Sequence, residues 1–146
     1  KSPYKTNFGA FVAQGGKKSP KSGYYFHLEP GACFVGGGLY MPDPKRLAVV
    51  RSVIDKDPSG LRKILASKSF KSTYPEGLSG ERVKTAPRGF AKDHPAVDLI
   101  QFKSFIAGTK LDDKIVLSSD LESAVMKRFA ALRPLNAWLN RALAKR

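Results

Sequence analysis

The order of hydrophobic and polar positions along the chain predicts strands first and helices later. Alternating, aromatic-rich stretches predict strands at residues 8–13, 24–29 and 33–41, and the last two are joined by Pro30-Gly31 as a hairpin. One more strand is predicted at residues 103–108. Most of the predicted sheet is therefore built early in the chain.

Helices are predicted where apolar residues recur at helical spacing. Asp43 is expected to cap the first helix, and a shorter helix is expected at residues 59–67. The clearest helix lies near the C-terminus, where Ser119 and Glu122 match a capping box and Pro134 is expected to kink or restart the helix. The helical residues expected to face the core are Leu47, Val50, Ile54, Leu121, Val125, Phe129 and Trp138.

The pattern between these helices is weaker. Residues 68–93 are expected to be irregular and basic, and Pro95 is expected to open a short helix. Strands followed by helices favour an α+β fold over a doubly wound sheet. We expect a single domain over residues 1–146, with a curved, largely antiparallel sheet and helices packed mainly on one face.

Composition narrows the class of protein. The chain has 146 residues, of which 42% are hydrophobic, and this fits one soluble globular domain. No apolar run approaches the roughly 18 residues of a spanning helix, so no membrane partner is expected. The single cysteine, Cys33, excludes an internal disulfide and a zinc cage built on cysteines, and it is expected to be buried in its strand. With no leader sequence at its start, the chain is expected to be cytoplasmic.

The net charge of +14 is large for this size and unevenly distributed. Residues 1–28 carry five basic and no acidic residues, and residues 62–92 carry eight basic and two acidic ones. Such a field attracts nucleic acid, phosphorylated metabolites or acidic lipid surfaces without choosing among them. The alternative is a solvated basic surface that serves no partner.

The predicted hairpin holds the first candidate site. Alternate residues of a strand share a face, so Tyr25, His27 and Glu29 are expected on one face. An imidazole beside a carboxylate forms a general acid/base pair or supplies two metal ligands, which are too few for a metal site. The alternative is a strand with a solvent-facing His and Glu. Nearby, Gly36-Gly37-Gly38 indicates close approach of a ligand or another backbone, or a bulge, and it lacks the ending of a P-loop.

The second candidate site is the segment 87–95. Arg88, Lys92, Asp93 and His94 lie there between two prolines, just before a predicted helix N-terminus that favours an anion. These residues are therefore expected to form a cradle for a phosphate or carboxylate. The alternative is a capping and turn motif, because caps use the same residue types.

Four motifs in order, at residues 1–7, 23–30, 36–42 and 87–95, resemble the bacterial family known as domain of unknown function 2461. The resemblance implies a cytoplasmic α/β protein without an established activity. It also implies that relatives carry a helical segment and an Arg- and Asp-containing stretch before the first motif, so this chain is expected to be the C-terminal two-thirds of a longer domain. The candidates raised by their motif positions are Tyr4, Lys5, Asn7, His27, Glu29, Lys92, Asp93 and His94.

Three functions follow from these features. The first is a pocket protein that binds a small phosphate- or carboxylate-bearing ligand, with enzymatic activity, cofactor and oligomeric state left open. In it, the charge is neutralised by Lys5, Arg88 and Lys92, protons are transferred by His27 and Glu29, and the walls are formed by Tyr25 and Tyr40. The second is a nucleic-acid-binding module that uses the basic surface, including the loop with Lys17, Lys18 and Lys21. The third is a non-catalytic structural or interaction domain.

Overall fold

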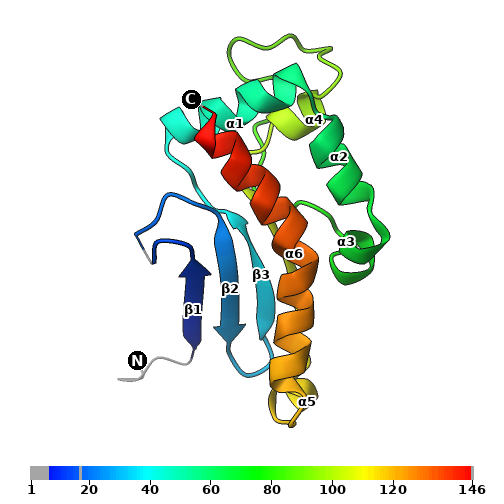
Figure 1. The fold of residues 1–146 in the computed structure, drawn as a ribbon. Helices are drawn as coiled ribbons and strands as arrows, with labels where there is room; N and C mark the ends of the chain where they lie inside the picture. Colours follow the sequence, from blue (N-terminus) through cyan, green and yellow to red (C-terminus); the bar gives the residue numbers. More distant parts are fainter. Residues whose placement is uncertain (1–6, 17, 146) are drawn as a thin grey trace.

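The computed structural model describes residues 7–16 and 18–145, and these form an α+β fold with one antiparallel sheet. The strands lie in the spatial order β1-β2-β3-β4 (Figure 1). They are β1 (Phe8–Ala13), β2 (Gly23–Leu28), β3 (Phe34–Leu39) and β4 (Phe105–Lys110). The helices in the described part are α1 (Pro44–Lys56), α2 (Ser59–Ala66), α3 (Lys68–Thr73), α4 (Val97–Ile100), α5 (Asp113–Val116) and α6 (Leu121–Ala144). The predicted fold class is confirmed.

Each pair of neighbouring strands is antiparallel, and the register aligns residues across three strands. Tyr25 lies between Phe11 of β1 and Gly36 of β3, and His27 lies between Gly9 and Phe34. The helices α1 to α4 separate β3 from β4 in sequence, yet the two strands pair along their whole length. Side chains far apart in the chain therefore meet on the faces of the sheet.

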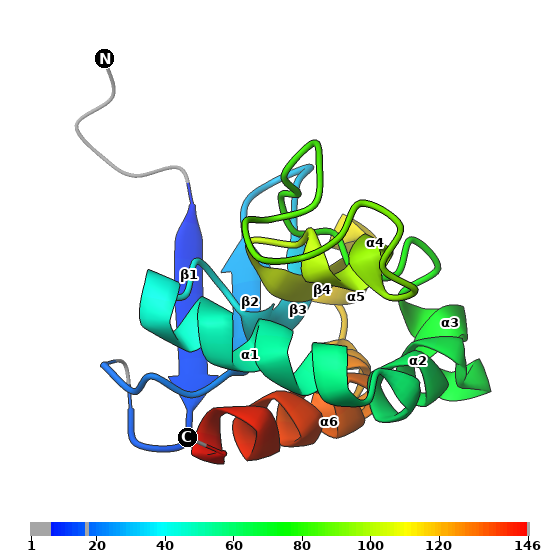
Figure 2. The same ribbon diagram turned by 90° about the horizontal axis from the view of Figure 1, so that it is seen from above.

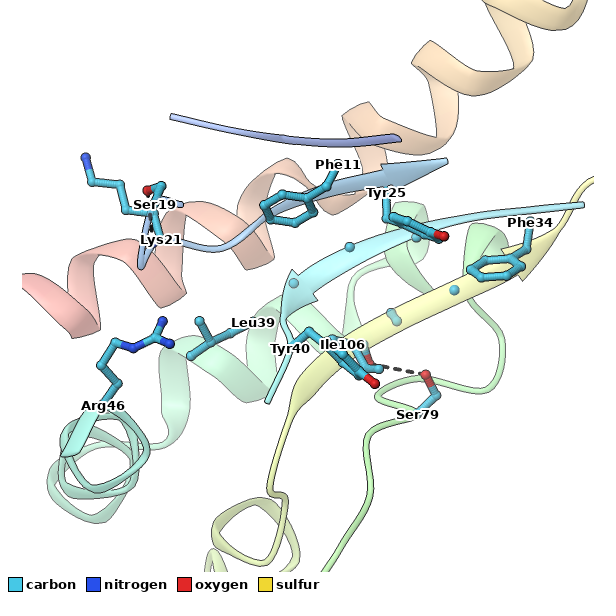
Figure 3. A pocket seen from close by; sticks show the side chains of 15 residues that line it. Phe11, Ser19, Lys21, Tyr25, Phe34, Leu39, Tyr40, Arg46, Ser79 and Ile106 are labelled. Carbon is cyan, nitrogen blue, oxygen red and sulfur yellow. Dashed lines mark hydrogen bonds between the residues drawn. The ribbon is translucent and has the colours of Figure 1, made fainter. Parts of the chain in front are cut away.

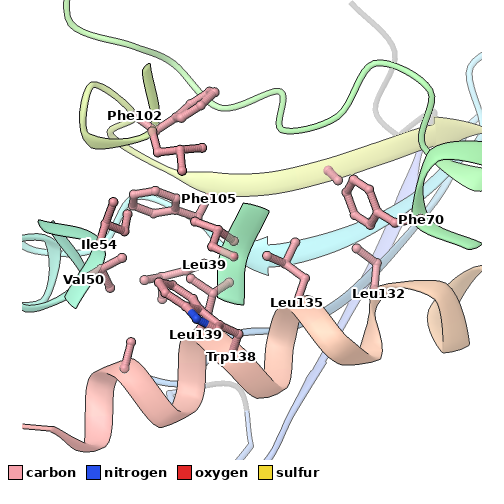
Figure 4. Close-up of a cluster of buried hydrophobic side chains, with 14 of the residues drawn as sticks. Leu39, Val50, Ile54, Phe70, Phe102, Phe105, Leu132, Leu135, Trp138 and Leu139 are labelled. Carbon is pink, nitrogen blue, oxygen red and sulfur yellow. The ribbon is translucent and has the colours of Figure 1, made fainter. Parts of the chain in front are cut away.

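Helix α6 runs along one face of the sheet, and α1 lies across the end of the sheet (Figures 1 and 2). The main core fills the space between them, and its buried side chains include Phe105 of β4, Ile54 of α1 and Leu135 of α6 (Figure 4). Burying such side chains stabilises a fold by about 1.5–3 kcal/mol each. Of the predicted core residues, Val50, Ile54 and Trp138 are buried, and Leu47, Leu121, Val125 and Phe129 pack against the core while partly exposed.

A smaller cluster lies where α6 crosses β2 and β3, around Cys33 and Val35. Tyr24 belongs to this side of the sheet, since its ring centroid lies 4.9 Å from that of Phe129. Phe26 and Leu28 pack on the same cluster. The covered face therefore takes one set of alternate β2 residues, and the other set lies on the open face.

Several boundaries differ from the sequence predictions: β3 begins at Phe34, just after Cys33, β4 begins at Phe105, α4 begins at Val97, and α5 was not predicted. Two further differences concern α3 and α6. Residues 68–73 form α3 because the Ser67 hydroxyl accepts from the Phe70 N–H and Phe70 is buried. The predicted capping box is wrong, because α6 follows Asp120 without a side-chain cap. This helix also continues through Pro134 without a restart. By contrast, Asp43 caps α1 as predicted and accepts from the Arg46 N–H at 2.8 Å.

Candidate ligand-binding groove

The open face of the sheet is hollowed into a groove with a volume of about 680 Å³ (Figure 3). Its floor is the middle of β3 and β4, and Ser79 borders it where the Ser79 N–H donates to the Ile106 carbonyl at 2.8 Å. The residues that give the groove its character are the aromatic Phe11, Tyr25, Phe34 and Tyr40, the glycines Gly36, Gly37, Gly38 and Gly108, and the cations Lys21 and Arg46.

Glycines make the floor flat because Gly36 and Gly108 pair directly across β3 and β4. At Gly36 the backbones are close: a Cβ atom would lie 2.5 Å from the Ala107 carbonyl oxygen. Gly38 has a φ of +117°, which L side chains rarely adopt. At Gly108 a Cβ atom would meet its nearest neighbour, the Val35 oxygen, at an ordinary 3.6 Å. Gly108 is thus the floor position where a side chain would fill the groove without a backbone clash.

A hydrogen-bonded chain of three side chains follows β2 on the open face. The Tyr25 hydroxyl lies 3.0 Å from His27 Nδ1, and His27 Nε2 lies 2.8 Å from Glu29 Oε1. An ionised carboxylate can only accept, so Nε2 carries a proton, and when the ring is neutral Nδ1 accepts from the Tyr25 hydroxyl. The predicted sharing of one face by these residues is confirmed by this geometry.

Two residues that the sequence did not mark as site candidates keep these three hydrogen-bonded side chains in place. The Phe34 ring stacks on His27, with centroids 4.7 Å apart and planes 22° apart. Gly9 faces His27 across the strands, and a Cβ atom on Gly9 would collide with the Tyr25 hydroxyl. An isolated glycine inside a predicted strand was the available signal for such a close approach.

The cationic end of the groove comes from two other segments. Lys21 Nζ donates to Gln14 Oε1 at 2.9 Å, so this ammonium contacts a neutral amide. Arg46 Nε lies 3.2 Å from Asp43 Oδ2, and a guanidinium N–H also donates to the Pro20 carbonyl. The N–H groups of Arg46 lower the pKa of the Asp43 carboxyl, with the backbone N–H contributing most. Arg46 is therefore partly neutralised, and Lys21 has no acidic partner among the described residues.

The predicted anion cradle has a different arrangement. His94 Nε2 lies 2.6 Å from Asp55 Oδ1, and its Nδ1 accepts from the Ala96 N–H at 2.9 Å. His94 therefore fastens its loop to α1. Arg88, Lys92 and Asp93 are exposed, and none of the four loop candidates is among the described residues that line the groove.

The segment after His94 is also attached to a helix, by hydrogen bonds from Arg62. Arg62 of α2 makes two bonds to Asp98, Nη1 to Oδ2 at 3.0 Å and Nη2 to Oδ1 at 2.8 Å, and it also donates to the Pro95 carbonyl. The Arg62 guanidinium lowers the pKa of the Asp98 carboxyl. These contacts favour the capping and turn interpretation of the loop.

The remaining candidates lie near the start of the chain or on the rim of the groove. Tyr4 and Lys5 lie outside the described residues, and Asn7 is exposed immediately before β1. Tyr40 is 68% exposed and lines the groove together with Tyr25. Of the predicted site residues, those on β2 and at the end of β3 lie on one face, whereas those of the loop do not join them.

Residues 7–16 and 18–145 contain no group of three or more His, Cys, Asp or Glu side chains placed to hold a metal ion. Within the same residues, no helix combines the length and the apolar character needed to cross a bilayer.

Comparisons with known proteins give the family. No curated protein and no solved structure matches the chain significantly. The family model described as conserved hypothetical protein (DUF2461) matches residues 1–138, which is nearly the whole chain. This confirms the resemblance carried by the four motifs, and the protein belongs to the DUF2461 family.

Proposed function

We propose that this protein binds a small ligand with a flat apolar body and a phosphate or carboxylate group in the groove on the open face of the sheet. The observation that carries the proposal is a glycine floor enclosed by aromatic side chains, with cations at one end (Figure 3). Pockets of roughly 300–1,000 Å³, mostly apolar with a few polar groups, are typical of small-molecule sites.

The shape of the apolar part of the groove favours a ligand with a flat body. The Tyr25 and Phe34 rings lie 5.5 Å apart on one side of the floor, where Gly36 and Gly108 present backbone alone. Aromatic walls stabilise planar groups through offset or edge contacts. Space at this floor would be lost if either glycine carried a side chain.

The cations at one end of the groove favour a ligand with an anionic group. Lys21 offers an ammonium whose partner in the described residues is an amide, and Arg46, which also lines the groove, adds N–H donors. The net charge of +14 raises the local concentration of anions around the whole molecule. In this proposal the ligand class expected from sequence is retained, and its anchors are Lys21 and Arg46 rather than Arg88 and Lys92.

The test is calorimetric titration with benzoate and with phenyl phosphate as probes. We expect saturable binding of at least one probe, and Gly108→Val is expected to weaken it at least tenfold by filling the floor. Lys21→Ala is expected to weaken binding about three- to tenfold, because one charged contact is lost. The matched control is Lys92→Ala, which removes an exposed cation of the loop and is expected to leave binding unchanged.

Circular dichroism and urea unfolding of each variant separate a blocked groove from a damaged fold. The proposal is wrong if folded Gly108→Val binds the probes as well as the unchanged protein. It is also wrong if Lys92→Ala, and not Lys21→Ala, removes binding, because the anion site would then lie on the loop.

A second candidate function is binding of single-stranded nucleic acid, favoured by exposed aromatic side chains beside cations. Phe11 is 39% exposed and Tyr40 is 68% exposed, and both line the groove that Lys21 borders. Bases stack on such side chains while cations follow the backbone. Oligothymidylate binding that falls steeply with salt, and that Lys18→Ala with Lys21→Ala weakens, would favour this function over a small ligand.

A further inference from the structure

We infer that Tyr25 is the group that exchanges a proton with the bound ligand, and that His27 with Glu29 is the base that takes the proton of Tyr25. The inference deepens the proposed function and rests on it for the identity of the substrate, a planar anion with an acidic hydrogen near the Tyr25 hydroxyl. It differs from the roles expected from sequence, in which His27 and Glu29 transfer protons and Tyr25 only forms part of the wall.

The hydrogen bonds assign these roles. Both ring nitrogens of His27 are occupied, Nδ1 by the Tyr25 hydroxyl and Nε2 by Glu29. Among the described residues, Tyr25 lines the groove and His27 does not. A proton that leaves a ligand in the groove therefore reaches the imidazole through the Tyr25 hydroxyl.

The order hydroxyl, imidazole, carboxylate is the order that activates nucleophiles and bases in triads. Here the two-residue period of a strand supplies it, because residues 25, 27 and 29 share a face of the same segment. The His27 side chain is 16% exposed and is stacked on Phe34, so its plane is fixed. Gly9 leaves the space that the hydroxyl occupies.

The proton transfers balance without a co-reactant. The Tyr25 O–H bond breaks as an N–H bond forms at His27 Nδ1, and the Glu29 carboxylate stabilises the resulting imidazolium. The phenolate oxygen then takes a proton from the ligand. The electron pair of the broken bond stays on the ligand. Reversal returns the proton to the same or another atom of the ligand. The reaction class is a proton shift within one substrate.

The experiment measures how fast benzenesulfonyl fluoride labels Tyr25, with Tyr40 of the same molecule as internal control. In this reaction an O–S bond forms at the tyrosine oxygen, the S–F bond breaks, fluoride leaves, and the phenol proton passes to the base. Mass spectrometry of peptides gives both rates. No native ligand is needed, so failure here is distinct from failure of probe binding.

We expect Tyr25 to be labelled at least ten times faster than the more exposed Tyr40, since a positioned base contributes about 10²–10⁴-fold. His27→Gln is expected to lower the Tyr25 rate at least tenfold, and Glu29→Gln severalfold, while the Tyr40 rate stays constant. In His27→Ala, added imidazole is expected to restore the Tyr25 rate, an effect that a purely structural histidine would not give.

A Tyr25 rate at or below that of Tyr40 overturns the inference, as does a Tyr25 rate that neither His27→Gln nor Glu29→Gln changes. Circular dichroism checks the fold of each variant. If His27→Gln does not fold, Glu29→Gln decides the question, because that side chain is 36% exposed and its loss leaves the core untouched.

Discussion

Each of the two histidines of this chain has one ring nitrogen against a carboxylate, but the partner of the other ring nitrogen differs between them. His27, on β2, and His94, just before α4, each place Nε2 against a carboxylate, at 2.8 Å from Glu29 and 2.6 Å from Asp55. The Nδ1 atom of His27 meets a side-chain hydroxyl, whereas that of His94 meets the backbone N–H of Ala96. The two regions are therefore distinguished by the group bonded to Nδ1, and not by the histidine–carboxylate pair.

The difference decides what each imidazole can do. A backbone N–H does not give up its proton at ordinary pH, so His94 is a fixed acceptor that closes a turn. A phenol hydroxyl can pass its proton to Nδ1, so His27 lies in a chain along which a proton can move. The His27 region also borders an open groove, while the His94 region is fastened to α1 and α2.

The largest expected change in stability is at His94. His94→Ala is expected to lower the free energy of unfolding by about 2 kcal/mol, because the N–H of fully buried Ala96 loses its acceptor. His27→Ala is expected to cost about 1 kcal/mol or less, because its partners are side chains that can turn to water. Urea unfolding measures both. A greater loss for His27→Ala would contradict the division of roles.

A smaller, pH-dependent change is expected at Asp98. Its pKa is lowered in the fold by Arg62, so the carboxylate stabilises the fold above the unfolded-state pKa, and this contribution is lost as pH falls through the folded value. Asp98→Asn is therefore expected to cost up to about 1 kcal/mol at neutral pH, as partly exposed pairs do. Its cost should vanish in strong acid.

Urea midpoints across a pH series measure this effect, and exposed Glu76, changed to Gln, is the control outside the ion pairs of the described residues. If the stability cost of Asp98→Asn grew as pH falls, the pH dependence would have the opposite sign. The Arg62–Asp98 ion pair would then not be what stabilises this segment.

The smallest expected change in stability is at Gly9. In Gly9→Ala the new methyl displaces the Tyr25 hydroxyl, the end of a flexible side chain, and the gain in strand propensity offsets part of the cost. We expect a change within about 0.5 kcal/mol. Nitrogen NMR of the rings should nevertheless show His27 Nδ1 losing its hydrogen bond while His94 keeps its own. Unchanged His27 signals would show that Gly9 does not place the hydroxyl.

The sequence predicted the open face well because a strand has a fixed period. Once residues 24–29 were assigned to a strand, Tyr25 and His27 had to share a face, and the apolar alternates had to meet the core. The four strands, the α1 cap at Asp43 and the buried Cys33 rest on equally local signals and are confirmed.

Long-range partners could not be predicted in the same way. The carboxylate that binds His94 is Asp55, 39 residues away, and the position of Arg46 near Lys21 depends on where α1 starts relative to the sheet. Gly108 becomes groove floor only through its pairing with Gly36. Those juxtapositions depend on register and packing, which no local pattern encodes.

The central claim is that the groove, and not the basic loop, is where a small anion binds. The most direct measurement is backbone amide NMR of the protein titrated with benzoate. We expect saturable shifts at Tyr25, Gly36 and Gly108, with none at Arg88 or His94. Shifts confined to the loop from Arg88 to His94, with the groove unchanged, would contradict it.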